Sequence, residues 1–108
     1  MTIWLVTRHA GAREWAHLRG FAVDRVVQHL ESESDIAAGD VVIGSLPANL
    51  AARLCERGGR YLHLSLDLPF EKRGIELTAD DMEHLGARLE EIALRRVADF
   101  TSPRPAVP

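Results

Sequence analysis

Two short loops in the sequence carry side chains that can bind a phosphate group and act on it. In the first, Thr7, Arg8 and His9 stand in a row, and Gly11 follows two residues later. Arginine presents a planar fork of N–H donors that matches phosphate oxygens, and histidine can donate or accept a proton near neutral pH. Threonine adds a hydroxyl that donates and accepts hydrogen bonds. These groups suit phosphodiester chemistry, with Arg8 and His9 as the candidate catalytic residues.

The second loop starts at Gly44 and leads into a predicted helix. Pro47 favours the first turn of a helix, and Ser45 is either the N-cap of that helix or a ligand contact. The free N–H groups and the positive dipole end of a helix N-terminus attract anions. We therefore expect the two loops to form one phosphate-sized cradle. Its predicted ligand-binding residues are Thr7, Gly11, Gly44, Ser45, Leu46 and Asn49.

Two of the polar residues also have a purely structural interpretation. Arg8 can be a surface arginine or pair with Glu14. His63 lies in a segment that alternates leucines with polar residues, and we expect it to be hydrogen-bonded and half-buried. If the first loop is not the catalytic centre, the polar side of that segment is the next candidate.

The elements that must position these loops follow from hydrophobic patterning. Apolar, β-branched or alternating runs predict strands at residues 2–7, 24–30, 40–45 and 60–68. Helical spacing predicts one helix between the first two strands, ended by Gly20, and another from Pro47 to about Arg57. This order predicts a small Rossmann-like α/β domain with a mainly parallel sheet flanked by helices. Ligands bind such sheets at the carboxyl ends of the strands, where both loops are expected.

The C-terminal part is predicted to be one long helix. Thr78 and Asp81 have the spacing of a capping box, with Asp in place of the usual Glu. The apolar residues that follow recur at helical steps and predict an amphipathic helix of about 18 to 20 residues. We expect residues 1–100 to form a single domain and the proline-rich tail, residues 101–108, to be disordered.

Composition excludes several classes of protein. The chain has 108 residues and a net charge of −3, so broad attraction to duplex DNA is not expected. No run approaches the roughly 18 apolar residues of a membrane span. The single cysteine, Cys55, is ordinary for a reducing cytosol, and a cytoplasmic location is predicted. Neither loop has metal-ligand spacing, so we expect no metal and no cofactor.

Known phosphate-binding motifs are absent or incomplete. The sequence has no G-x-x-x-x-G-K-[ST] motif and no G-x-G-x-x-G after the first predicted strand. Arg8 and His9 resemble the R-H-G start of the histidine phosphatases, whose histidine becomes phosphorylated. Ala10 stands in place of that glycine, the chain is short for that fold, and a second arginine and histidine pair is not evident. The resemblance to histidine phosphatases is therefore disfavoured.

A wider set of residues resembles one family. The segments that carry the resemblance run from Trp4 through Arg8-His9-Ala10-Gly11 to Trp15, and through residues 24–27, 39–52, 61–66 and 73–77. Together they resemble the Csx-sixteen family of type III CRISPR accessory proteins over roughly residues 1–95. The resemblance implies a compact domain related to the CRISPR-associated Rossmann fold. It also implies a ring nuclease, which linearises cyclic oligoadenylate second messengers and so turns the immune response off.

The residues agree with that implication and extend it. Cleavage without metal would use the ribose 2′-hydroxyl as nucleophile, Arg8 to stabilise the developing charge and His9 as the candidate general acid. A homodimer would match the two-fold symmetry of cyclic tetra-adenylate, and the leucines of residues 60–68 and the last helix offer apolar surface for it. A module that sequesters the messenger without cutting it is the alternative. An adaptor subunit that binds no nucleotide is a third possibility.

Overall fold

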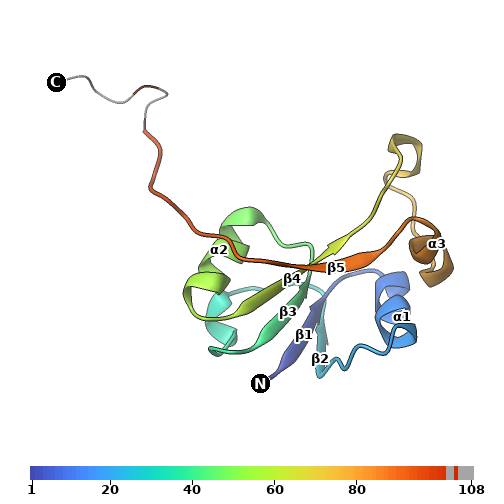
Figure 1. Cartoon of the computed structure of the whole chain (residues 1–108), viewed down its shortest axis with the longest axis horizontal. Coiled ribbons are helices and arrows are strands. Elements are labelled where there is room, and N and C mark those ends of the chain that lie inside the picture. Colours follow the sequence, from blue (N-terminus) through green and yellow to red (C-terminus); the bar gives the residue numbers. More distant parts are fainter. Residues whose placement is uncertain (102–103, 105–108) are drawn as a thin grey trace.

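The sheet has five strands and is mainly parallel, as the sequence predicts. The computed structural model describes residues 1–101 and 104. Its strand order is β2-β1-β3-β4-β5, in which the first four strands are parallel and β5 runs antiparallel to β4 (Figure 1). The strands are β1 (Ile3–Val6), β2 (Arg25–Val27), β3 (Val41–Gly44), β4 (Arg60–Ser65) and β5 (Arg88–Ile92).

Helices cover both faces of the sheet and divide the core in two. The first face packs against α1 (Ala10–Leu18) and α3 (Ala79–His84), and its core contains Leu5 and Trp15. The other face packs against α2 (Ala48–Glu56), and its core contains Val42 and Leu54. Each large apolar side chain buried in this way contributes about 1.5–3 kcal/mol. The arrangement confirms the predicted small Rossmann-like α/β fold with helices on both faces of the sheet.

The prediction of one long C-terminal helix is wrong. The predicted capping box at Thr78 is present, but α3 ends at His84, and Gly86 then adopts a φ of 72° that breaks the helical path. The chain continues as β5, which places Leu89 against the core of α1 and α3 and Ile92 against the core of α2. Residues three apart lie on one side of a helix but on opposite faces of a strand, so the spacing that suggested a helix also fits a strand buried on both faces.

The antiparallel strand β5 covers one edge of β4, the strand whose leucines were predicted to offer apolar surface for a dimer. β5 pairs with β4 over its full length, and Arg60 donates two hydrogen bonds, of 2.9 and 2.7 Å, to the Glu91 carboxylate. Leu62 and Leu64 of β4 pack against the core beneath α1 and α3. The apolar surface from which a homodimer was predicted is therefore largely covered within the chain itself.

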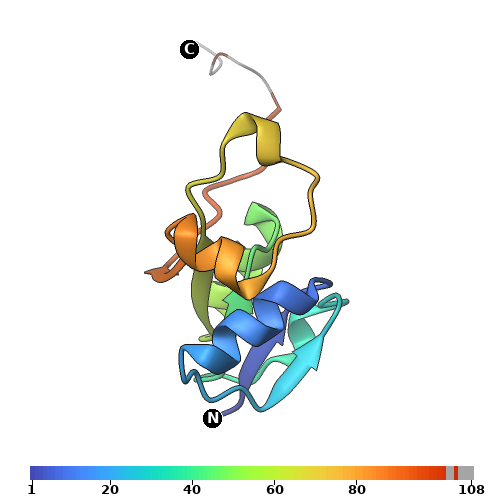
Figure 2. The same cartoon turned by 90° about the vertical axis from the view of Figure 1, so that its right-hand side faces the viewer.

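Two stretches outside the sheet complete the description. Between β4 and α3 the chain arches away from the sheet, with the short helix η2 (Phe70–Lys72) at its tip (Figure 2). The tail predicted to be disordered falls mostly on residues 102–103 and 105–108, which lie outside the described residues. Among the helices of residues 1–101 and 104, none has the length and apolarity needed to cross a bilayer.

Candidate functional site

Both predicted loops lie at the point where the strand order reverses. From β1 the chain moves to β2 on one side, and from β3 it moves to β4 on the other. The loops after β1 and β3 therefore flank the crevice where doubly wound sheets with this 2-1-3-4 order bind ligands. Gly44 pairs with Val6 at this edge, and a β-carbon on Gly44 would lie 2.7 Å from the Val6 carbonyl oxygen. Glycine thus lets the two strand ends approach each other closely.

The loop after β1 presents two exposed side chains. Its turn is held by the Thr7 hydroxyl, which accepts a 3.1 Å hydrogen bond from the His9 backbone N–H. His9 is the N-cap residue of α1, but its side chain does not cap the helix. Arg8 is exposed, and among residues 1–101 and 104 it has no hydrogen-bond or ion-pair partner. The alternative pairing of Arg8 with Glu14 is therefore not present, and the guanidinium is available to a ligand.

A glutamate that the sequence analysis did not single out faces His9. The two carboxylate oxygens of Glu76 lie 3.1 and 3.0 Å from His9 Nδ1. Glu76 lies between η2 and α3, so this contact brings the arching segment to the loop after β1. A carboxylate on one imidazole nitrogen fixes the orientation of the ring and leaves the other nitrogen for a reacting group. The two residues are 67 positions apart, so no local sequence pattern could have predicted this contact.

Gly11 has a packing function that the loop prediction did not include. It is buried in the first turn of α1, and a β-carbon there would overlap the Leu77 carbonyl oxygen. The start of α1 is therefore pressed against the backbone of Leu77 and Thr78. This close approach keeps Glu76 within reach of His9.

The loop after β3 is fixed by two neighbouring strands. The Ser45 hydroxyl donates to the Leu64 carbonyl oxygen at 3.3 Å, and the Leu46 N–H donates to the Tyr61 hydroxyl at 2.9 Å. The N-cap residue of α2 is Pro47, so Ser45 is not the cap of that helix. Asn49 lies in the first turn, where its side-chain oxygen accepts the Leu50 N–H at 3.0 Å. No acidic residue occupies the first turn of α1 or of α2.

A tyrosine and a histidine on β4 lie directly beside this loop. Tyr61 is buried, and its hydroxyl lies 3.2 Å from the Gly44 carbonyl oxygen and 2.6 Å from His63 Nδ1. Burial raises the pKa of the Tyr61 hydroxyl, so it remains a neutral phenol. His63 is half-buried and hydrogen-bonded, as predicted. Sequence reasoning did not single out Tyr61. The alternating leucines predict the strand, but they do not indicate which polar residue of the strand reaches the loop.

Two hollows of the molecule lie beside α1. One of about 480 Å³ lies between α1 and α3, lined by Trp15, Arg19 and Glu83 among others. A second of about 460 Å³ lies beside α1 and reaches Phe21 and Val26. Neither includes a residue of the loop after β3. Among residues 1–101 and 104, no cluster of three or more potential metal ligands is found.

The fold and the site together define a class of protein. The chain is a doubly wound α/β domain whose two switch-point loops expose cationic and hydrogen-bonding groups at uncapped helix N-termini. A family model described as "Putative CRISPR-associated protein (Cas_VVA1548)" matches residues 4–95, and the chain belongs to this CRISPR-associated family. No curated protein and no solved structure matches the chain.

Proposed function

We propose that this CRISPR-associated protein is a ring nuclease of the Csx-sixteen kind, which binds and cleaves cyclic oligoadenylate. The observation that carries the proposal is the switch-point edge itself. There the N-termini of α1 and α2 lack side-chain caps and acidic residues, and Arg8 is exposed beside them without a partner among the described residues. Such an edge favours a phosphodiester over a neutral or cationic ligand. The CRISPR-associated family supports a substrate from CRISPR immunity.

The proposed reaction needs no metal. The ribose 2′-hydroxyl gives its proton to a base as its oxygen attacks the adjacent phosphorus, the new P–O2′ bond forms, and the P–O5′ bond breaks to leave a 2′,3′-cyclic phosphate. Arg8 stabilises the charge that develops on the phosphate oxygens. Protonated His9, held by Glu76 through Nδ1, gives the proton of its other nitrogen to the departing 5′ oxygen.

The remaining predicted site residues bind the ligand. Backbone N–H groups of the two helix starts and the side chains of Thr7, Ser45 and Asn49 would hold the phosphates and riboses. Cyclic tetra-adenylate is the preferred candidate, and a homodimer would offer it two equivalent sites. Because the leucines of β4 pack within the chain, the support for the dimer is now the symmetry of the ligand. A cytoplasmic location and the absence of duplex DNA binding accompany this proposal.

One experiment tests the proposal directly. Pure protein is incubated with labelled cyclic tetra-adenylate in chelator, and the products are separated by length. Linear products with 2′,3′-cyclic phosphate ends are expected. Cleavage only after addition of magnesium or manganese would overturn the metal-independent mechanism. Tight binding without products would instead identify a sequestering module, and the absence of both would favour an adaptor subunit.

A further inference from the structure

The hydroxyl of Tyr61 lies at the centre of a small hydrogen-bond network beneath the loop after β3. Three groups surround it: the Leu46 N–H at 2.9 Å, the Gly44 carbonyl oxygen at 3.2 Å and His63 Nδ1 at 2.6 Å. A phenol hydroxyl donates one hydrogen and accepts through its oxygen lone pairs. The Leu46 N–H can only donate and the Gly44 carbonyl can only accept, so two of the three bonds have a fixed direction.

These directions allow two arrangements, which differ in the tautomer of His63. When Tyr61 gives its single hydrogen to the Gly44 carbonyl, the contact with His63 is satisfied only if Nδ1 carries a hydrogen and donates it to the hydroxyl. The other arrangement, with Tyr61 donating to His63, removes the bond to a buried strand carbonyl. Only the first arrangement keeps all three contacts as hydrogen bonds, and it has a hydrogen on Nδ1. Neutral His63 is then left with a lone pair on Nε2, which makes that atom a proton acceptor.

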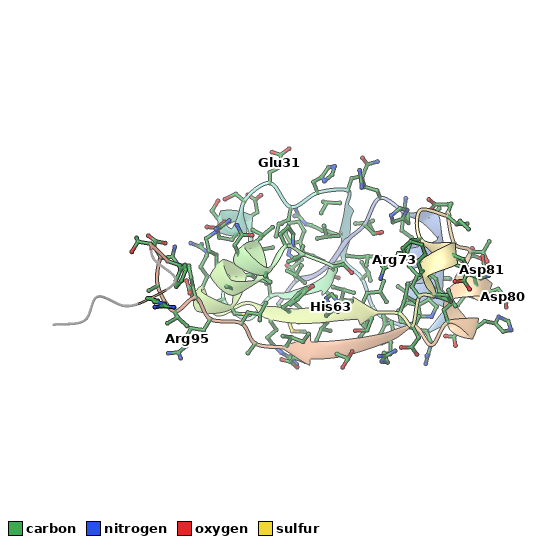
Figure 3. The ribbon with its side chains drawn as sticks, turned by 90° about the horizontal axis from the view of Figure 1, so that it is seen from above. Glu31, His63, Arg73, Asp80, Asp81 and Arg95 are labelled. Carbon is green, nitrogen blue, oxygen red and sulfur yellow. The ribbon has the colours of Figure 1, made fainter. Side chains whose placement is uncertain are left out.

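His63 lies where a ligand of the switch-point loops would be. It pairs with Gly44 in the sheet register, and Gly44 in turn pairs with Val6 at the end of β1. Because position 44 has no side chain, the surface between Val6 and His63 is not filled from β3. Figure 3 shows His63 on β4, whose arrow points toward the end of the molecule that carries Arg73 and α3.

The charged neighbours of His63 do not occupy its free nitrogen. Across the sheet, β5 places Glu90 opposite His63, and the Glu90 carboxylate lies 3.7 Å from Arg88 Nε. On β4, the hydrogen bond of His63 goes through Nδ1 to Tyr61. Among residues 1–101 and 104, Nε2 has no hydrogen-bond partner. A half-buried imidazole with one nitrogen fixed and the other open is arranged as a general base.

Resting on the ring-nuclease function proposed above, we infer that His63 is the catalytic base of this site and that Tyr61 is its positioning residue. His63 Nε2 takes the proton of the ribose 2′-hydroxyl as the 2′-oxygen attacks phosphorus. The P–O5′ bond then breaks, and the 5′ oxygen receives its proton from His9. The reaction thus uses one histidine from each side of β3, and the number of protons is conserved.

The test compares His63→Gln with His17→Gln, a matched change of an exposed histidine in the last turn of α1. Single-turnover cleavage of cyclic tetra-adenylate in chelator should slow by about a hundredfold or more in His63→Gln and be unchanged in His17→Gln. Binding of a 2′-deoxy ring, which lacks the nucleophile, should persist in both variants. Cleavage by His63→Gln at the rate of the unmodified protein would overturn the assignment while leaving the proposed function intact.

The role of Tyr61 needs a readout that loss of stability alone would not change. Long-range ¹H–¹⁵N spectra report which imidazole nitrogen carries the hydrogen. We expect Nδ1–H for neutral His63 in the unmodified protein, a shift toward Nε2–H in Tyr61→Phe, and slower cleavage by that variant. Finding Nε2–H in the unmodified protein would contradict the inferred network. If the unmodified protein neither cuts nor binds the ring, the proposed function and this inference both fail.

Discussion

The N-termini of α1 and α3 lie against each other but differ in their capping: α3 has a side-chain cap and α1 has none. At α3, the Thr78 hydroxyl accepts the Asp81 N–H and the Asp81 carboxylate accepts the Thr78 N–H, with Asp80 as a further acid in the first turn. At α1, the N-cap residue His9 makes no side-chain cap, and the first turn has no acid. Acids near a helix N-terminus stabilise the helix, and a missing cap costs about 1 kcal/mol.

This difference separates structural stabilisation from availability for a ligand. The six-residue α3 is too short to be stable alone, so a full capping box and packing hold it in place. In α1 and α2, the same N–H donors face the switch-point crevice and are not neutralised by carboxylates. The region proposed to bind a ligand is thus marked by helix-capping interactions that the chain does not form there. Four measurements test that contrast.

The largest effect is expected from Arg8→Ala at the uncapped end. Removal of one preorganised donor should slow single-turnover cleavage of cyclic tetra-adenylate by about a hundredfold or more, while binding largely remains. Stability should not change, because Arg8 is exposed and has no partner among the described residues. Arg95→Ala is the matched control, since Arg95 is also exposed and Figure 3 shows it at the end of the molecule away from Arg73 and Asp80. An equal loss of cleavage rate in both variants would show that Arg8 has no special role at the uncapped end of α1.

Gly11→Ala breaks the contact between the two helix starts. Alanine is favoured over glycine inside a helix by about 0.5–1 kcal/mol, but its β-carbon would overlap the Leu77 carbonyl oxygen. Overpacking of this kind costs about 1–3 kcal/mol, so we expect net destabilisation in urea unfolding. Ala10→Ser, at the exposed neighbouring position, should change stability much less. A stabilised Gly11→Ala variant would show that α1 and the segment before α3 are not closely packed in solution.

Thr78→Ala removes the cap of α3 and should lower the free energy of unfolding by about 1 kcal/mol. Cleavage of the ring should continue at the normal rate, because this end of α3 serves structure. Thr78→Ser keeps the hydroxyl and is expected to retain most of the stability. A cleavage defect as large as that of Arg8→Ala would instead place the cap within the functional site.

The smallest expected effect is a change in how stability depends on pH. The hydrogen bond from the Thr78 backbone N–H lowers the pKa of the Asp81 carboxyl below its ordinary value. The unfolded value is about 3.9, so the ionised carboxylate adds stability above that pH and loses it as pH falls through the lowered folded value. Asp81→Asn should be less stable than the unmodified protein near pH 7, and the gap should close in acid. Glu31→Gln, at an exposed position, is the matched control for the loss of one acidic side chain.

The sequence predicts what is encoded locally. The apolar run of β3 and the proline after it place the second loop correctly, and Thr78 with Asp81 predicts the capping box because both residues lie in one turn. Leu89 and Ile92 misled the prediction, since their spacing fits a helix face as well as a strand buried on both sides. Glu76 could not be assigned to His9, because only the tertiary path of the chain brings the two together.

The placement of the candidate site residues in the fold was predicted in part for the same reason. The residues that end strands could be placed at the carboxyl edge from the strand pattern alone. The strand pattern could not predict the hydrogen bonds of these residues. The Ser45 hydroxyl donates to the Leu64 carbonyl oxygen, and the Tyr61 hydroxyl accepts the Leu46 N–H of the loop. These hydrogen-bond partners depend on the register of β4 against β3, because the register decides which β4 residues lie beside the loop.

The antiparallel strand β5 also has a consequence for biosynthesis. Until residue 92 has been translated, β4 has a free edge, because its partner on that side is absent. A nascent chain that already contains β4 therefore exposes unpaired N–H and C=O groups beside partly covered leucines, a surface that favours pairing between chains. Ribosome pausing within residues 66–87 would prolong that exposure. Translation speed over this segment would then influence how much of the protein escapes aggregation.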